Sequence, residues 1–169
     1  MTFKLVPAAA AGSLLALTLT ACGNDSVSSG DAEDSAKRAV AAVTLAESEV
    51  GGTAFELDEE GRSGWDVDLV ADNEVTEVRV NRDGTKVEKA QSDGRIDADD
   101  RLRLERATVS LADAITTAAG EVTGLVKGVE LDRHRVTTVV WKVEIYDGDD
   151  DIDVSVDVSS GEVVNVDRD

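Results

Sequence analysis

Two short stretches of sequence are the best indicators of the fold: WDVDL at residues 65–69 and WKVEI at residues 141–145. Each begins with one of the two tryptophans and then alternates apolar with polar or charged residues. Alternation with a period of two is typical of a strand that is buried on one face only. Trp65 and Trp141 share the parity of the apolar residues that follow them, so we expect both in a core; the alternative is an anchor for a partner.

Similar patterns surround both stretches, and a helical pattern precedes each set. Apolar residues at helical spacing predict helices over residues 35–49 and 110–122, with Ser35 or Asp34 capping the first and Ser110 capping the second. Strands are expected at residues 54–57, 65–69, 75–80 and 86–89, and again at 129–131, 137–146, 152–158 and 162–166. Glycine-containing turns separate several of them.

The same order of elements therefore occurs twice. Residues 56–58 (ELD) match residues 130–132 (ELD), and the two tryptophans match each other. An internal duplication follows. We predict an α+β fold of two tandem units, each one helix packed on a three- to four-stranded antiparallel sheet. The units span residues 35–90 and 107–169, and the polar residues 91–106 are predicted to be a linker.

The second unit resembles the PepSY domain. The resemblance rests on an Ala-rich helix at residues 114–119, the strands at 128–131 and 141–145, and the hairpin VDVSSGEVV at residues 156–164. The first unit is less similar, because its hairpin reads NRDG at residues 81–84 and lacks the Asp that follows the first hairpin valine. The resemblance implies a domain of peptidase propeptides, membrane proteins and lipoproteins that has no catalytic residues and modulates peptidases or binds partners at the envelope.

The N-terminus is predicted to be a lipoprotein signal peptide. Lys4 precedes an uncharged segment, Leu5 to Thr20, which ends in LTAC at residues 19–22. This ending resembles a lipobox, which implies cleavage after Ala21 and lipidation of Cys22. A membrane-spanning anchor would need about 20 mostly apolar residues. Residues 22–34 then form a flexible tether, and the mature protein lies on the extracytoplasmic face of the bacterial cell membrane.

Composition excludes several classes of function. Acidic residues number 36 against 17 basic ones, a formal net charge of −19, which repels nucleic acid and attracts cations or basic partners. Cys22 is the one cysteine, so a disulfide within the chain is impossible, and after lipidation no thiol nucleophile remains. We expect no nucleic-acid partner.

Residues suited to catalysis are few. His134, the single histidine, lies between two arginines in DRHR at residues 132–135, where we expect an exposed loop. Several acids occur in pairs on predicted strands, and glycosidases use such pairs across a sugar cleft. The chain is poor in aromatic residues, however, and these acids alternate with apolar residues as on the solvent side of a sheet. The paired acids are Asp66 with Asp68, Glu74 with Glu77, and Asp153 with Asp157. We predict that the protein is not an enzyme.

An acidic run, DGDDDID at residues 147–153, is the best candidate for a cation site. Its weak candidate ligands are Asp147, Asp149, Asp151 and Asp153, because Ca²⁺ prefers clustered carboxylate oxygens. Ile152 stands where an EF-hand requires glycine, so we expect no cofactor and at most weak Ca²⁺ binding. A solvated hairpin turn is the simpler interpretation.

Three hypotheses of function follow. The first is a non-enzymatic envelope lipoprotein that binds or regulates a protein partner, such as a peptidase, through an acidic sheet face. The second is an acidic cation-binding or cell-wall-associated surface module. The third is a purely structural unit.

Overall fold

The computed structural model describes residues 27–135 and 137–168, and the predicted signal peptide, Ala21 and Cys22 lie outside this range. Its helices are α1 (Ser29–Val50), α2 (Ala98–Leu104) and α3 (Leu111–Glu121). The strands are β1 (Thr53–Glu59), β2 (Trp65–Ala71), β3 (Glu74–Val80), β4 (Val87–Arg95), β5 (Leu125–His134), β6 (Thr138–Tyr146), β7 (Asp151–Asp157) and β8 (Val163–Arg168). No described helix is long and apolar enough to cross a membrane.

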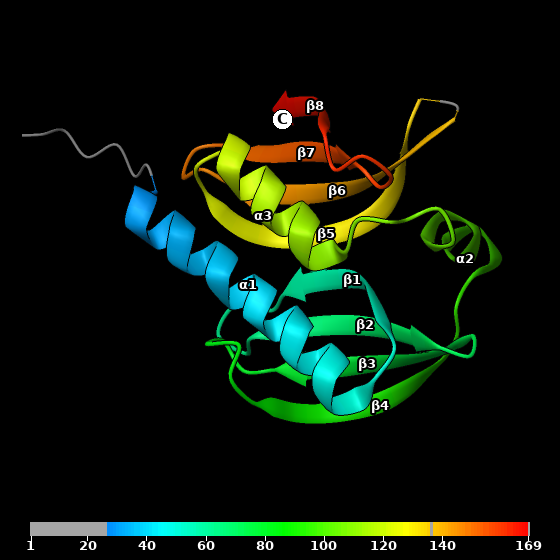
Figure 1. Ribbon diagram of the computed structural model, residues 1–169. Coiled ribbons are helices and arrows are strands. Elements are labelled where there is room, and N and C mark those ends of the chain that lie inside the picture. The colour runs from blue at the N-terminus through cyan, green and yellow to red at the C-terminus, as the bar shows by residue number, and fades with distance from the viewer. Residues whose placement is uncertain (1–26, 136, 169) are drawn as a thin grey trace, which may run out of the picture.

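All eight strands join in one antiparallel sheet, in the order β4-β3-β2-β1-β5-β6-β7-β8 (Figure 1). The predicted α+β class, with helices packed on antiparallel strands, is confirmed. Each half contributes four consecutive strands, and the halves meet where β1 pairs with β5. Leu57 lies opposite Val129 at this junction, and Asp58 lies opposite Gly128. The two predicted small sheets are therefore a single continuous one.

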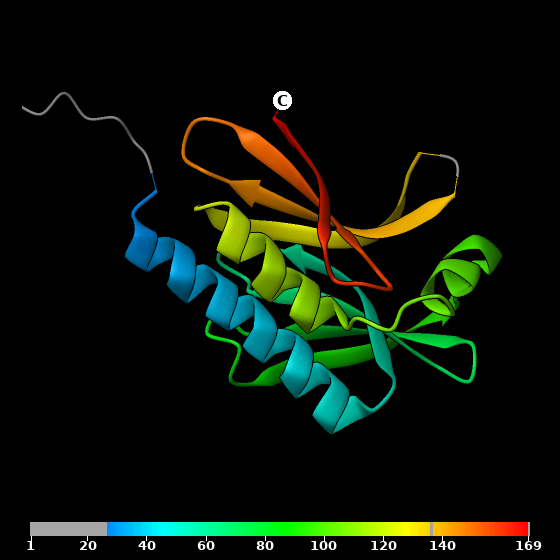
Figure 2. The ribbon, with the colours of Figure 1, turned by 45° about the horizontal axis from the view of Figure 1, so that its top comes forward.

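Helices α1 and α3 lie side by side on one face of this sheet, as Figures 1 and 2 both show. Their inner positions are mostly alanine, which lets the helices approach the strands closely. Both tryptophans are buried beneath them, at 2% and 1% exposure, which confirms the predicted core positions. The indole of Trp65 donates to the carbonyl oxygen of Arg82 at 3.1 Å, and that of Trp141 donates to Val109 at 3.0 Å. Each buried ring thus has a partner for its polar atom.

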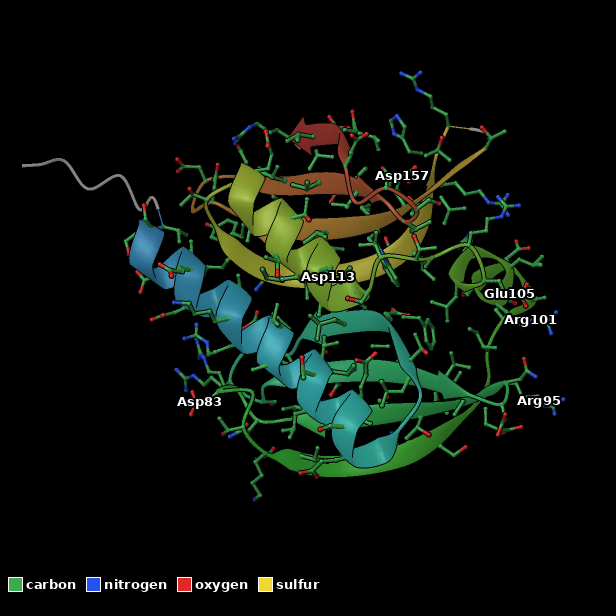
Figure 3. The ribbon with its side chains drawn as sticks, in the orientation of Figure 1. Asp83, Arg95, Arg101, Glu105, Asp113 and Asp157 are labelled. Carbon is green, nitrogen blue, oxygen red and sulfur yellow. The ribbon has the colours of Figure 1, made fainter. Side chains whose placement is uncertain are left out.

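Helix α1 begins six residues earlier than predicted. Ser28 is its N-cap, and the hydroxyl accepts a hydrogen bond from the backbone N–H of Asp31 at 3.2 Å. Ala32 faces inward in the added residues and is buried, and Ser35 is a buried residue inside the helix instead of its cap. The tether prediction is therefore wrong for residues 29–34. The predicted cap of α3 is confirmed, because Ser110 accepts from Asp113 N–H at 3.1 Å; Figure 3 labels Asp113 on α3.

A side-chain hydrogen bond connects the two halves in addition to the shared sheet. The hydroxyl of Ser35, on α1 of the first half, accepts a hydrogen bond from the N–H of Val126 in β5 at 3.2 Å. Ser35 is 4% exposed, so this bond is buried. Helix α1 therefore packs on strands of both halves.

The predicted linker contains regular structure. Strand β4 continues to Arg95 instead of ending near residue 89, and α2 follows, capped by Asp97. Strand β4 lies at the edge of the sheet and is largely exposed, so it needs no apolar alternation to pair with β3. Helix α2 lies at one end of the sheet (Figure 1), where Arg103 donates to the carbonyl oxygen of Leu131 at 3.2 Å.

Candidate binding surface

The helices leave the opposite face of the sheet uncovered, and we call it the open face. In Figure 1 α1 and α3 lie in front of the sheet, so the open face is turned away from the viewer. In β2 the residues under the helices are Trp65, Val67 and Leu69, which places Asp66 and Asp68 on the open face. Because paired residues of adjacent strands share a face, the register extends this assignment across the sheet.

A continuous row of paired residues crosses the open face from β3 to β8. In strand order it comprises Arg79, Asp66, Asp58, Gly128, Glu144, Asp153 and Asp167. A neighbouring row comprises Glu77, Asp68 and Glu56 in the first half, and Glu130, Lys142 and Ser155 in the second. Most of these side chains are carboxylates, so the predicted acidic face exists and is concentrated in two rows.

Some of the carboxylates in these rows are neutralised by a cation of the same chain. Arg79 donates two hydrogen bonds to the carboxylate of Asp66, one from Nε and one from a terminal nitrogen. Lys142 Nζ lies 2.5 Å from Glu130 Oε1 and 4.0 Å from Asp153 Oδ2. Charge-assisted contacts of this kind are stronger than neutral hydrogen bonds.

The centre of the face is not neutralised. Glu56, Asp58, Asp68 and Glu144 form no ion pair with any residue in the part of the chain that the structure describes. Burial, reinforced by neighbouring acids, raises the pKa of Glu56 to about 7 and that of Asp68 to about 6. The pKa values of Asp58 and Glu144 are raised too, again chiefly by burial. The chain thus holds together carboxylates that repel one another.

A small cavity lies among these carboxylates, over Gly128. Its volume is about 140 Å³, and its lining is Glu56, Asp58, Gly128, Val129, Glu130, Lys142 and Glu144. A methyl group on Gly128 would come within 3.3 Å of Asp58 Oδ1 and 3.4 Å of the carbonyl oxygen of Leu57. Glycine inside a strand weakens it and often marks the close approach of a ligand or another backbone. The cavity exists because this position lacks a side chain.

The acidic run at residues 147–153 is arranged as a turn. The carboxylate of Asp147 accepts from the N–H groups of Asp149 and Asp150, each at 3.0 Å, and from Arg168 Nη1 at 2.8 Å. These hydrogen bonds lower the pKa of Asp147 to about 2. Asp151 and Asp153 lie in β7, and Asp153 belongs to the open face. Among residues 27–135 and 137–168, no three or more His, Cys, Asp or Glu side chains are grouped to hold a metal ion.

His134 is not in a loop, as the sequence suggested, but is the last residue of β5, opposite Thr138. Its side chain is partly exposed. The turn follows directly, with Arg135 at φ 62°. The strand is longer than predicted because β5 pairs with β6 along its whole length.

A second hollow lies on the helical side, between α1 and α3. It has a volume of about 480 Å³, and small residues such as Ala36, Ala119 and Gly120 line much of it. Neither this groove nor the cavity over Gly128 was predicted from the sequence. The signal for the second was an isolated glycine in an otherwise regular strand pattern, between Lys127 and Val129.

Comparisons with known proteins identify the family of the second half. Residues 108–167 match the PepSY family, described as "Peptidase propeptide and YPEB domain", so this part of the chain is a PepSY domain. The match begins just before α3 and ends in β8, and it agrees with the resemblance of residues 107–169. The first half repeats the order of one helix and four strands, but it lies outside the match.

Comparison with curated proteins finds no match. Among solved structures, a candidate lipoprotein of Clostridium difficile 630 is similar with a TM-score of 0.46 and 20% identity, over 75% of this chain and 88% of that one. A candidate periplasmic protein of Bacteroides eggerthii DSM 20697 gives a TM-score of 0.29 and 15% identity, over 75% and 86%. At these scores neither likeness bears on function.

Proposed function

We propose that this chain is a non-enzymatic lipoprotein of the bacterial cell envelope that binds or regulates a protein partner, such as a peptidase, through the open face. The family of the second half, a propeptide-type domain, supports a regulatory rather than a catalytic role. The lipobox-like ending at Cys22 supports the location outside the membrane.

The observation that carries the proposal is the unneutralised centre of the open face. Carboxylates that repel one another lower the free energy of unfolding. Proteins keep destabilising arrangements of this kind mainly at functional sites. Two other acids of the same face do have a cation beside them, since Asp66 pairs with Arg79 and Glu130 pairs with Lys142. A basic partner would supply the missing positive charge, and complementary charge also steers association and suppresses wrong partners.

Photo-crosslinking in intact cells tests this proposal. A photoreactive amino acid replaces Gln91 or Asn165, which flank the open face, or Thr44, which is exposed on α1. We expect the two open-face positions to capture the same protein through a basic segment, identified by mass spectrometry, and Thr44 to capture none of it. Equal capture from Thr44, or no capture from either open-face position, would contradict the proposal.

The proposed location has its own test. Cells fed a clickable fatty acid should label the wild-type protein and should not label a Cys22→Ala variant. Unchanged labelling of that variant would show that the lipid is elsewhere, and absence of labelling in both would remove the lipid anchor from the proposal.

A further inference from the structure

We propose that the cavity over Gly128 is the contact point of the open face, and that it receives an arginine side chain from a basic segment of the partner. This inference rests on the proposed function and makes it more specific, because it names the chemical group that binds and the position where it binds.

Gly128 lies in β5 at the junction of the two halves, paired with Asp58 on one side and Glu144 on the other. It interrupts the row of side chains that crosses the open face. A side chain from another molecule can therefore reach the sheet backbone here.

Carboxylates from both halves line the cavity: Glu56 and Asp58 come from β1, Glu130 from β5 and Glu144 from β6. Lys142 is the one cation of the lining, and it is occupied by Glu130 and Asp153. The lining therefore has more negative than positive charge, and a cationic group that enters would be attracted without displacing an ion pair of the chain.

The geometry of these carboxylates favours a guanidinium over a metal ion or an ammonium. The carboxylates around the cavity are not grouped as the ligands of a metal ion. A guanidinium is planar and carries five N–H donors in a fixed fork, so it can bridge carboxylates that do not converge on one point. An ammonium is a compact point charge and bridges them less well.

The same row of the open face already contains a guanidinium, that of Arg79. Arg79 donates two hydrogen bonds to the carboxylate of Asp66. Asp66 lies opposite Asp58 on the neighbouring strand, and Asp58 borders the cavity. The partner's arginine would repeat this contact one strand further along, on the unneutralised side of Asp58. The carboxylates around the cavity would then gain a second cation only in the complex.

The test uses a synthetic peptide, Ser-Arg-Ser-Arg-Ser, and its analogue with citrulline in place of arginine. Citrulline keeps the size of arginine and removes its charge. Binding to the full mature chain in nonionic detergent is measured by calorimetry at low ionic strength. We expect the arginine peptide to bind and the citrulline peptide not to bind.

Two pairs of variants separate the cavity from general attraction between opposite charges. Gly128→Ala keeps every charge and adds a methyl group beside the cavity, 3.3 Å from Asp58 Oδ1, whereas Gly120→Ala adds the same methyl group on α3, where nothing lies within 4 Å of it. Glu144→Gln removes one charge at the cavity, and Glu121→Gln removes one on the helical side. We expect Gly128→Ala and Glu144→Gln each to weaken binding about tenfold, as for the loss of one charge-assisted contact. The two controls should change it less than about twofold.

Several outcomes would overturn the inference. Equal binding by Gly128→Ala and wild type, or equal losses in Glu144→Gln and Glu121→Gln, would show attraction to the net charge alone. Displacement of the peptide by Ca²⁺ that binds the same carboxylates would assign the cavity to a cation instead. If Gly128→Ala fails to fold, the Glu144 and Glu121 pair still decides.

The two proposals fail separately. Capture of a partner from the open face in cells, unchanged by Gly128→Ala, would leave the proposed function standing and remove this inference. Arginine-peptide binding at the cavity without any partner in cells would do the reverse.

Discussion

Leu57 of β1 lies directly opposite Val129 of β5, and this pair joins the two halves of the molecule into one sheet. Both side chains are buried, with exposures of 0% and 2%. The core is therefore continuous across the junction, and α1 reaches the second half through Ser35. Each half has one long helix followed by four strands, but the two halves share one core.

The shared core predicts that the halves unfold together. The chain offers one tryptophan in each half, so Trp65→Phe leaves Trp141 as the reporter of the second half, and Trp141→Phe leaves Trp65 as the reporter of the first. We expect each variant to unfold in denaturant with the same midpoint by tryptophan fluorescence, which reports one half, and by far-UV circular dichroism, which reports the whole chain.

Leu57→Ala should then lower the free energy of unfolding by about 2–5 kcal/mol, because the site is fully buried. Its effect should appear equally at both tryptophans. Separate midpoints, or destabilisation of the first half alone, would show two independent domains.

The bond between α1 and β5 gives a second prediction. Ser35→Ala removes the acceptor of the Val126 N–H and leaves a buried donor unpaired, at a cost of about 1–3 kcal/mol. Ser48→Ala is the control, because its hydroxyl bonds to Leu45 of the same helix and is exposed. Chemical denaturation of both variants measures the difference. An effect of Ser35→Ala no larger than that of Ser48→Ala would contradict the importance of this bond.

Most helices and strands could be predicted from the sequence, but the pairing of β1 with β5, which joins the two halves into one sheet, could not. Alternation identified the strands around Trp65 and Trp141, because a half-buried strand must alternate. Pairing of β1 with β5 leaves no such mark, since each strand has the same pattern whether or not it gains a neighbour. The start of α1 was missed because Ala32 is the one buried apolar residue of residues 29–34 and is too small to give an apolar stripe.

The candidate surface was predicted in kind but not in detail. The alternation of Asp66 and Asp68 with apolar residues was enough to place acids on a solvent face. Which acids remain unneutralised depends on the register between strands, such as Asp58 opposite Gly128, and register cannot be read from one strand alone. The lipid site at Cys22 stays a prediction.

Glu56 gives a prediction about pH and stability. Burial and four neighbouring acids raise its pKa from 4.5 to about 7, so the folded state binds this proton more tightly than the unfolded state does. The contribution of Glu56 to the free energy of unfolding is therefore fully present below pH 4.5 and is lost as the pH rises from about 4.5 to about 7.

Glu56→Gln should consequently stabilise the protein above pH 7 and change little below pH 4.5. Because the side chain is half exposed, solvent screening limits the gain to about 1 kcal/mol. Denaturation of wild type, Glu56→Gln and the control Glu121→Gln at both pH values measures it. A lower free energy of unfolding in Glu56→Gln than in wild type at high pH would show that this carboxylate stabilises the fold instead of destabilising it.

Asp147 gives the last prediction, and it concerns the cation hypothesis. Its carboxylate already accepts hydrogen bonds from Asp149, Asp150 and Arg168, and a Ca²⁺ ion at this turn would have to displace some of them. We therefore expect millimolar Ca²⁺, the range of weak extracellular sites, to raise the melting temperature no more than Mg²⁺ does. Since these hydrogen bonds lower the pKa of Asp147 from 3.8 to about 2, their contribution is present above pH 3.8 and is lost as pH falls toward 2. Asp147→Asn should accordingly lower the melting temperature at pH 7, and the difference from wild type should shrink at low pH. A rise with Ca²⁺ that Mg²⁺ does not reproduce, and that Asp147→Asn abolishes, would instead establish the turn as a calcium site.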